Sequence, residues 1–309
     1  MKRINRRNFL KTSASIATGS LITSALLPKI SSGFLRIGMP DITCVKGNDY
    51  FLNAQKALEL LGGMSQFVKP GSKVALLISP HWDKPATFTS PDVALAIIDL
   101  CYKAGAGDIY CLASPGEDYW AKSARAGQMT EYIKALKPGS APVEIEIPQG
   151  KYLKKAEIVP ELLSADVFIN IPIAKQHEGC NFTGLLKNMM GACPHTTNRF
   201  FHFGAGNNKG FYENVEFLSQ CIADLNLVRK PDLCVIDATE VILTNGPAGP
   251  GEIMKPQRVL SGTDPVAMDA FAAHIIGKNP EDILKIKMAQ DHGIGKMDYQ
   301  SMIITEVVL

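Results

Sequence analysis

The chain has 309 residues, of which 46% are hydrophobic and 20% charged, and its net charge is +2. This composition is typical of globular protein and is long enough for one large core or two modest ones. The near-neutral charge gives no support for nucleic-acid binding, and the lack of a purely apolar run of eighteen residues beyond the N-terminal leader excludes a polytopic membrane protein.

Residues 1–32 form a predicted leader. Arg6-Arg7 followed by Phe9-Leu10-Lys11 resembles the twin-arginine signal, and a weakly hydrophobic run follows over 12–27. The resemblance implies that the twin-arginine translocation machinery is a partner and that the location is periplasmic or otherwise extracytoplasmic. An uncleaved leader would anchor the chain to the membrane. Residues 33–309 are expected to form a single α/β domain.

Strand and helix patterns alternate over the first half of this domain. Apolar runs predict strands at 34–39, 73–79, 108–113 and 143–147. Helical spacing predicts helices at 48–61 and 91–104, two helical segments within 118–137 and a helical turn at 160–164. Such alternation predicts an α/β fold with a mainly parallel sheet and helices on both faces. His81 follows the second strand and is a weaker candidate for the site.

The most informative stretch is 165–191. A predicted strand at 167–171 is followed by a polar loop that holds Lys175 and His177, and a helical pattern begins at Asn181. In an open α/β sheet, ligands collect at the loop that follows a strand, and the next helix offers unpaired N–H groups. This strand, loop and helix together predict an anion-binding site.

A long functional loop is predicted after this unit, at 195–209, where the chain is polar, Gly-rich and aromatic. The remaining patterns predict a helix at 213–228, a strand at 232–237, a turn-rich loop at 244–251, a strand at 258–261, helices at 264–276 and 280–290, and a strand at 302–309. Asp264, which precedes Pro265, is expected to cap its helix.

Four side chains are the expected catalytic residues: Lys175, His177, Lys187 and His202. The lysines would stabilise negative charge, and the histidines would transfer protons because their reference pKa lies near neutrality. The expected ligand-binding residues are Thr183, Asn188, Arg199, Asp237 and Asn245. Three alternatives stay open: that the lysines are simply solvated, that Asn181 simply caps the helix, and that His202 is simply exposed.

A metal site is a second interpretation of the same stretch. His177 with Cys180, and Cys193 with His195, bracket the predicted helix with ligand types that suit a transition metal. A helix of ten residues spans about 15 Å, which would separate the two pairs unless the chain folds back sharply. The metal interpretation is therefore the lesser one.

Several familiar motifs are absent from the sequence. The seven cysteines form no C-x-x-C pair, which argues against an iron–sulfur cluster. The chain also has no G-x-S-x-G elbow, no Walker A loop and no dinucleotide fingerprint. The elbow's absence removes the common hydrolase interpretation.

The motifs that are present resemble, in their order, the family known as domain of unknown function 362. They are Lys-x-His at 175–177, Lys-Asn-Met-x-Gly at 187–191, Arg199 with Phe201-His202, Ile-Asp-Ala-Thr at 236–239, Asn-Gly-Pro at 245–247 and Asp-Pro-Val-Ala at 264–267. The resemblance runs from about residue 73 to 295 and supports the fold and the site. Some members are fused to ferredoxin domains, whereas this chain is similar to the stand-alone exported form.

Two functions follow as expectations. The first is an exported enzyme that binds an anionic small molecule or cofactor at residues 170–202. A redox- or cofactor-linked role is implied only by association with the fused relatives, and a metal-linked one only by the spacing of the cysteines and histidines. The second is a non-catalytic protein that handles a ligand or cofactor for an exported redox partner and uses the same pocket. The sequence does not identify the cofactor, and a metal ion stays open.

Overall fold

The computed structural model describes residues 39–205 and 214–309. The predicted leader at 1–32 and most of the strand predicted at 34–39 lie outside the described residues, as does the end of the loop predicted at 195–209. No helix in the described ranges is long and apolar enough to cross a membrane.

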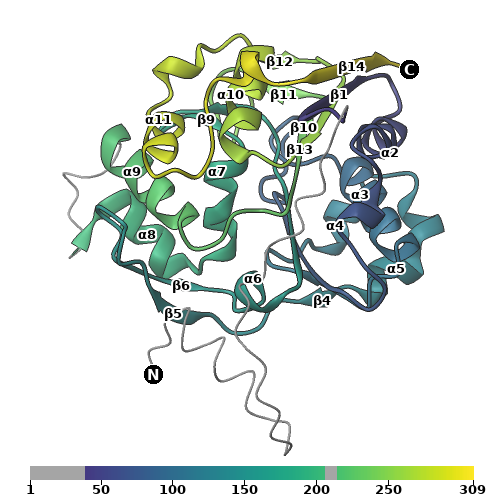
Figure 1. Cartoon of the computed structure of the whole chain (residues 1–309), viewed down its shortest axis with the longest axis horizontal. Coiled ribbons are helices and arrows are strands. Elements are labelled where there is room, and N and C mark those ends of the chain that lie inside the picture. Colours follow the sequence, from purple (N-terminus) through teal and green to yellow (C-terminus); the bar gives the residue numbers. More distant parts are fainter. Residues whose placement is uncertain (1–38, 206–213) are drawn as a thin grey trace, which may run out of the picture.

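An eight-stranded sheet forms the centre of the molecule (Figure 1). Its strands, in spatial order, are β14 (Ile304–Val308), β1 (Ile42–Lys46), β13 (Arg258–Gly262), β10 (Leu233–Ala238), β7 (Val167–Ile171), β2 (Lys73–Ile78), β3 (Asp108–Cys111) and β4 (Lys137–Pro138). Only β13 runs antiparallel to its two neighbours. The prediction of a mainly parallel sheet is therefore confirmed.

Helices cover both faces of the sheet, as the sequence predicts (Figure 1). Side chains along a strand point alternately to the two faces, so Val74 and Leu76 of β2 join one core while Ala75 and Leu77 join the other. The first core packs against α2 (Tyr50–Leu60), α3 (Pro91–Lys103), α4 (Glu117–Trp120) and α5 (Thr130–Ala135). The second packs against α6 (Glu161–Ser164), α7 (Leu185–Asn188), α8 (His195–Phe203), α9 (Val215–Asn226), α10 (Pro265–Ile275) and α11 (Leu284–Asp291).

Three short hairpins lie outside the main sheet. They are β5 (Val143–Glu146) with β6 (Lys155–Ile158), β8 (Lys175–His177) with β9 (Asn181–Thr183), and β11 (Val241–Ile242) with β12 (Ile253–Met254). The hairpin of β8 and β9 extends from the end of β7 and carries the Lys-x-His motif.

Two predictions for the central stretch are wrong. Asn181 does not start a helix, because residues 181–183 pair with 175–177 as a hairpin and α7 begins only at Leu185. The stretch predicted as a long irregular loop begins with the nine-residue helix α8. The predicted cap at Asp264 is confirmed, since its carboxylate accepts hydrogen bonds from the N–H groups of Val266 and Ala267.

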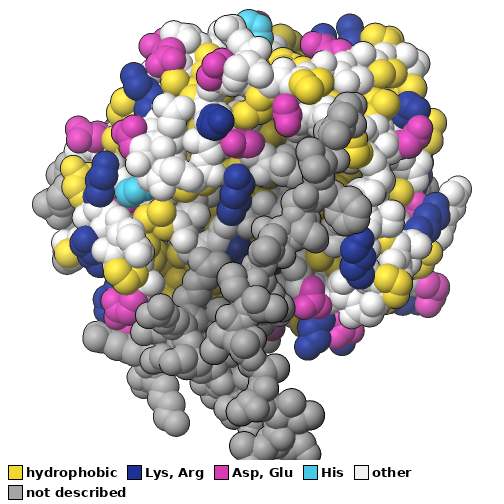
Figure 2. Space-filling view, viewed as in Figure 1, with side chains coloured by type: hydrophobic (Ala, Val, Ile, Leu, Met, Phe, Trp, Pro, Cys, Tyr) yellow, Lys and Arg dark blue, Asp and Glu magenta, His cyan; other side chains and the backbone are white. Residues whose placement is uncertain are grey.

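On the face of the molecule seen in Figure 2, cationic and anionic side chains are interspersed and hydrophobic side chains occur in small groups. This mixture is typical of the solvated surface of a globular domain.

Candidate functional site

A cavity of about 480 Å³ lies beyond the ends of β2 and β7. Ligands of open α/β sheets collect at the carboxyl ends of the strands, and this cavity has that position. Its lining comes from the segments after β2 and β7 and from the helices that pack beside them: Ser79, His81, Trp82, Lys175, His177, Glu178, Gly179, Thr183, Lys187, Asn188, Met190, Gly191, Asn198, Phe201, His202, Phe203, Asn214, Leu218 and Pro247.

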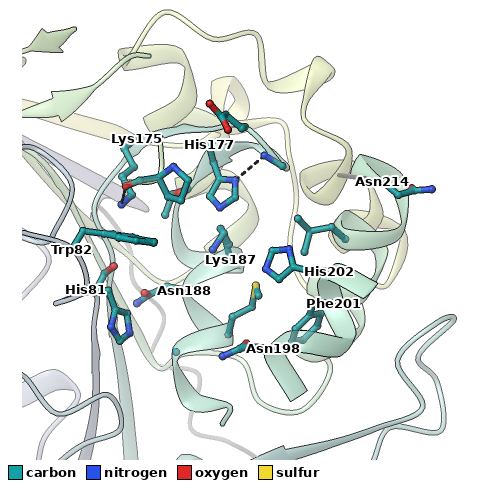
Figure 3. A pocket seen from close by; sticks show the side chains of 18 of the residues that line it. His81, Trp82, Lys175, His177, Lys187, Asn188, Asn198, Phe201, His202 and Asn214 are labelled. Atoms are coloured by element: carbon teal, nitrogen blue, oxygen red, sulfur yellow. Dashed lines mark hydrogen bonds between the residues drawn. The ribbon is translucent and has the colours of Figure 1, made fainter. Parts of the chain in front are cut away.

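The structure brings together all four side chains predicted as catalytic. Lys175, His177, Lys187 and His202 line the cavity, as does the predicted ligand-binding residue Asn188 (Figure 3). Thr183, also predicted to bind the ligand, lines it too. Three other predicted residues, Arg199, Asp237 and Asn245, do not line it.

The hairpin of β8 and β9 explains why Lys175 and His177 share one cavity. Residues two apart on a strand point to the same face, so both side chains face inward, while Gln176 between them accepts a hydrogen bond from the N–H of Gly246. Thr183 lies directly opposite Lys175 in the register of the hairpin. Asn181 turns the chain with a positive φ of 65°.

Lys175 is almost fully buried, with 2% of its surface exposed. Its ammonium group donates hydrogen bonds to the carbonyl oxygens of Thr87 and, at 2.8 Å, of Pro247. Burial, followed by the positive charge of Lys187, lowers the pKa of Lys175 to about 7. Lys175 can therefore gain or lose a proton near neutral pH.

His177 is held as a neutral hydrogen-bond donor. The backbone N–H of Gly179 donates to its Nδ1 at 3.0 Å, so the proton of the neutral ring sits on Nε2 (Figure 3). Burial lowers its pKa to about 2, with Lys187 and then Lys285 as the next causes.

Lys187 extends from the short helix α7 into the same cavity. Among the described residues its ammonium group has no hydrogen-bond or ion-pair partner. Burial is the largest cause that lowers its pKa. The side chain of its neighbour Asn188 is held by the central sheet, because its amide donates to the carbonyl of Leu77 on β2 and to Oδ1 of Asn170 on β7, each at 2.8 Å.

The start of α7 is not open to an anion, contrary to the sequence-based prediction. The carboxylate of Asp269 already accepts hydrogen bonds from the N–H groups of Leu185, at 2.6 Å, and Leu186, at 3.1 Å. The carboxylate of Asp269 thus takes the position that the prediction gave to a ligand. The negative charge of an anion in the cavity would therefore be offset by side chains rather than by the start of α7.

Two further histidines complete the lining. His202 lies on α8 and His81 follows β2, and each has a lowered pKa, with burial as the largest cause and Lys187 as the next. Both rings therefore favour the neutral form, in which one nitrogen donates and the other accepts a hydrogen bond.

Arg199, Asp237 and Asn245 have local structural contacts instead. The Arg199 guanidinium lies over the ring of Phe203, 5.0 Å from its centroid. Asp237 accepts hydrogen bonds from the N–H of Ser90 and from the N–H and hydroxyl of Thr239. Burial raises the pKa of Asp237 to about 6.

Asn245 donates to the carbonyl of Pro250 at 3.0 Å. This bond lies within the turn-rich loop, so Asn245 shapes that turn rather than the cavity.

The predicted metal ligands do not come together. Within residues 39–205 and 214–309 no group of three or more His, Cys, Asp or Glu side chains could hold a metal ion. Cys180 is buried, and its thiol contacts the carbonyl of Phe182 at 3.4 Å, while Cys193 is also buried and His195 is exposed. His177, Cys180, Cys193 and His195 therefore form no such group among the described residues.

Two buried polar atoms in the lining lack a partner among the described residues. They are Oγ1 of Thr183 and Oδ1 of Asn198. Buried polar atoms are nearly always hydrogen-bonded, so such atoms in a cavity wall indicate that a ligand or water completes them.

Some residues of the site are missed by the sequence-based prediction. Trp82 and Asn198 line the cavity, while Asp269 and Lys285 support it from behind, where the Lys285 ammonium donates to the carbonyls of Cys180 and Phe182. Trp82 follows a predicted strand and could have been found by its place. Asp269 and Lys285 could not have been found, because they lie on helices 84 and 105 positions further along the chain than the residues they contact, Leu185 and Cys180.

The chain belongs to the family described as domain of unknown function 362, which it matches over residues 74–274. It is 28% identical over 236 residues to a thylakoid-associated protein from Synechocystis sp., and this match covers 73% of the chain and 70% of that protein.

Two solved structures share a weaker likeness of fold. The lactate racemase apoprotein from Thermoanaerobacterium thermosaccharolyticum is 14% identical, with a TM-score of 0.44 over 72% of this chain and 54% of that one. A protein from Thermotoga maritima is 11% identical, with a TM-score of 0.39 over 78% of this chain and 58% of that one. The chain thus spans little more than half the length of either structure.

Proposed function

We propose that this member of the domain of unknown function 362 family is an enzyme that binds a small organic anion in the cavity and moves a proton on it. In this proposal Lys187 and Thr183 hold the anionic group, and Lys175, His177 and His202 supply hydrogen bonds and proton transfer. Asn188 contributes to the wall that positions the ligand.

One observation carries the proposal: two ammonium groups, Lys175 and Lys187, face one cavity, and no described carboxylate pairs with either. Glu178, which supplies the single carboxylate among the lining residues that the structure describes, has an exposed side chain. Burying two like charges without a counter-charge is unfavourable, and a bound anion would offset that cost. The orphaned hydroxyl of Thr183 offers the same anion a hydrogen bond.

The acid–base role rests on Lys175. With a pKa near 7, it exists in both forms near neutral pH, which suits a general acid or base. The neutral amine would accept a proton from the ligand and become an ammonium, and the ammonium would return it. His177, which stays neutral, would donate from Nε2 to the oxygen on which negative charge develops.

Binding is tested by titrating the protein with inorganic phosphate, pyrophosphate and malate. Trp82 lines the cavity and is 50% exposed, whereas Trp120, the other tryptophan, is 6% exposed, so tryptophan fluorescence reports mainly on the cavity. We expect at least one anion to change the fluorescence, and Lys187→Met to weaken its binding about tenfold or more.

The matched control is Lys46→Met, because Lys46 is exposed and does not line the cavity. This variant should bind as the native protein does. The proposal fails if none of the anions binds, or if Lys187→Met and Lys46→Met bind equally well.

Export by the twin-arginine route is a separate part of the proposal, supported by the sequence of residues 5–11. Replacing both Arg6 and Arg7 by lysine should retain the protein in the cytoplasm of a bacterial host, as measured by cell fractionation. Equal export of the variant and the native chain would contradict this part alone.

A further inference from the structure

Trp82 has an unusual backbone conformation. Its φ is 77°, in the left-handed region that bulky side chains rarely adopt. Outliers of this kind persist only where the surrounding structure holds them, and they concentrate at ligand sites. The strain therefore requires an explanation other than local preference.

Stability of the fold does not supply that explanation. Half of the Trp82 surface is exposed, and its indole N–H has no hydrogen-bond partner among the described residues. Trp120 shows the contrast, since it is 6% exposed and packs edge-on against Tyr119 with 4.8 Å between ring centroids. Trp120 is a core tryptophan, and Trp82 is not.

The ring of Trp82 instead forms part of the cavity wall. Figure 3 shows it extending towards the cavity between Lys175 and His81. Met190, Phe201 and Leu218 are further apolar side chains in the lining. The cavity thus combines a cationic centre with a flat aromatic face and an apolar wall.

A cavity of about 480 Å³ is also larger than a bare inorganic anion requires, and lies in the range of sites for organic ligands. A saturated hydrocarbon chain would pack against the apolar wall equally well but would not stack on the flat face of the Trp82 indole. A planar ring would, because aromatic rings gain from offset or edge-on stacking beyond the burial of area.

We propose that the ligand is an aromatic or otherwise planar, unsaturated carboxylate, whose ring stacks on Trp82 while its carboxylate lies at Lys187. This inference rests on the proposed anion site and names the class of molecule that the site takes. It makes Trp82 a residue that determines specificity.

The test compares benzoate with cyclohexanecarboxylate by isothermal titration calorimetry on the full chain. The two probes have the same charge and the same number of carbon atoms, and they differ in the flat ring. We expect the native protein to prefer benzoate by about three- to tenfold. Trp82→Leu should remove this preference while it still binds cyclohexanecarboxylate, and Trp82→Phe should keep most of it.

Thermal unfolding of both variants confirms that each is folded before it is titrated. Equal binding of the two probes by the native protein, or an unchanged preference in Trp82→Leu, overturns the inference. Binding of phosphate or pyrophosphate with no binding of benzoate also overturns it, but leaves the anion site in place. If none of these anions binds, the anion site itself fails.

Discussion

Lys187 makes Lys175 harder to protonate, because both ammonium groups face the same cavity. Burial is the larger cause and the charge of Lys187 the second, and together they lower the pKa of Lys175 to about 7. This relationship links binding to catalysis, since an anion that neutralises Lys187 would also change the proton affinity of Lys175.

The first prediction concerns this coupling. Lys187→Met should raise the pKa of Lys175, because the substitution removes the repulsion but keeps most of the buried volume. The pKa is measured by NMR titration of ¹³C-labelled lysine side chains, with the Lys175 signal assigned by its loss in Lys175→Met. Lys46→Met should leave the titration unchanged. An unaltered Lys175 pKa in Lys187→Met would contradict the coupling.

The second prediction concerns stability and pH. The pKa of Lys175 is about 7 in the folded state against 10.5 for a lysine exposed to water, so between these values the unfolded chain holds a proton that the folded chain has released. The contribution of Lys175 to the free energy of unfolding therefore rises with pH in this window and is lowest at pH values below it. The free energy of unfolding of the native protein should increase relative to Lys175→Met by up to about 1.4 kcal/mol per pH unit.

Urea unfolding of both proteins at about pH 7 and about pH 9 measures this difference. A difference that stays constant would mean that Lys175 has its ordinary pKa in the folded state, and a difference that shrinks as the pH rises would mean that its pKa is raised. Either result would contradict the prediction.

The third prediction concerns the proton on His177. Its Nδ1 accepts the N–H of Gly179, and burial lowers its pKa to about 2, so the ring should stay neutral with its proton on Nε2 throughout the neutral range. Nitrogen-15 NMR of the histidine rings distinguishes the two nitrogens, and His177→Gln identifies the signal. Titration of this ring near its reference pKa would sink the assignment.

The fourth prediction concerns the cap on α7. A Cβ at Gly184 would collide with Oδ1 of Asp269, the atom that accepts the Leu185 N–H. Gly184→Ala should therefore displace the cap and lower the free energy of unfolding by about 1–3 kcal/mol, because buried donors lose their acceptor. The measurement is urea unfolding together with pyrophosphate titration, since Lys187 lies on this helix.

Gly116→Ala is the matched control. No atom lies within 4 Å of a Cβ at Gly116, and its φ of −80° suits any residue. This substitution should leave both stability and affinity nearly unchanged. A loss as large as that of Gly184→Ala would mean that the cap is not the cause.

Much of the fold could be predicted from the sequence because its elements have strong local signals. The β-branched run at 167–171 is buried on both faces as a central strand, and the cap at Asp264 forms as expected. Short elements gave weaker signals. The three-residue strands β8 and β9 are too short to show a period, which is why the sequence of β9 predicts the start of a helix instead.

For the site, the cationic cluster could be predicted from the sequence, but the carboxylates that support it could not. Lys175, His177 and Lys187 could be predicted to converge because they follow one strand end. The role of Asp269 could not, because its contact with Leu185 joins residues 84 positions apart. The structural role of Asp237 could not be predicted either, because its carboxylate accepts a hydrogen bond from the N–H of Ser90, which is far away in the sequence.

The central claim is that the cavity holds an aromatic carboxylate with its negative charge at Lys187, and a crystal structure grown with 4-bromobenzoate tests it most directly. The anomalous signal of bromine locates the molecule independently of its carboxylate. We predict a carboxylate oxygen within about 3 Å of Nζ of Lys187, hydrogen-bonded to the orphaned Oγ1 of Thr183 as well. Bromine peaks found only outside the cavity would contradict the claim.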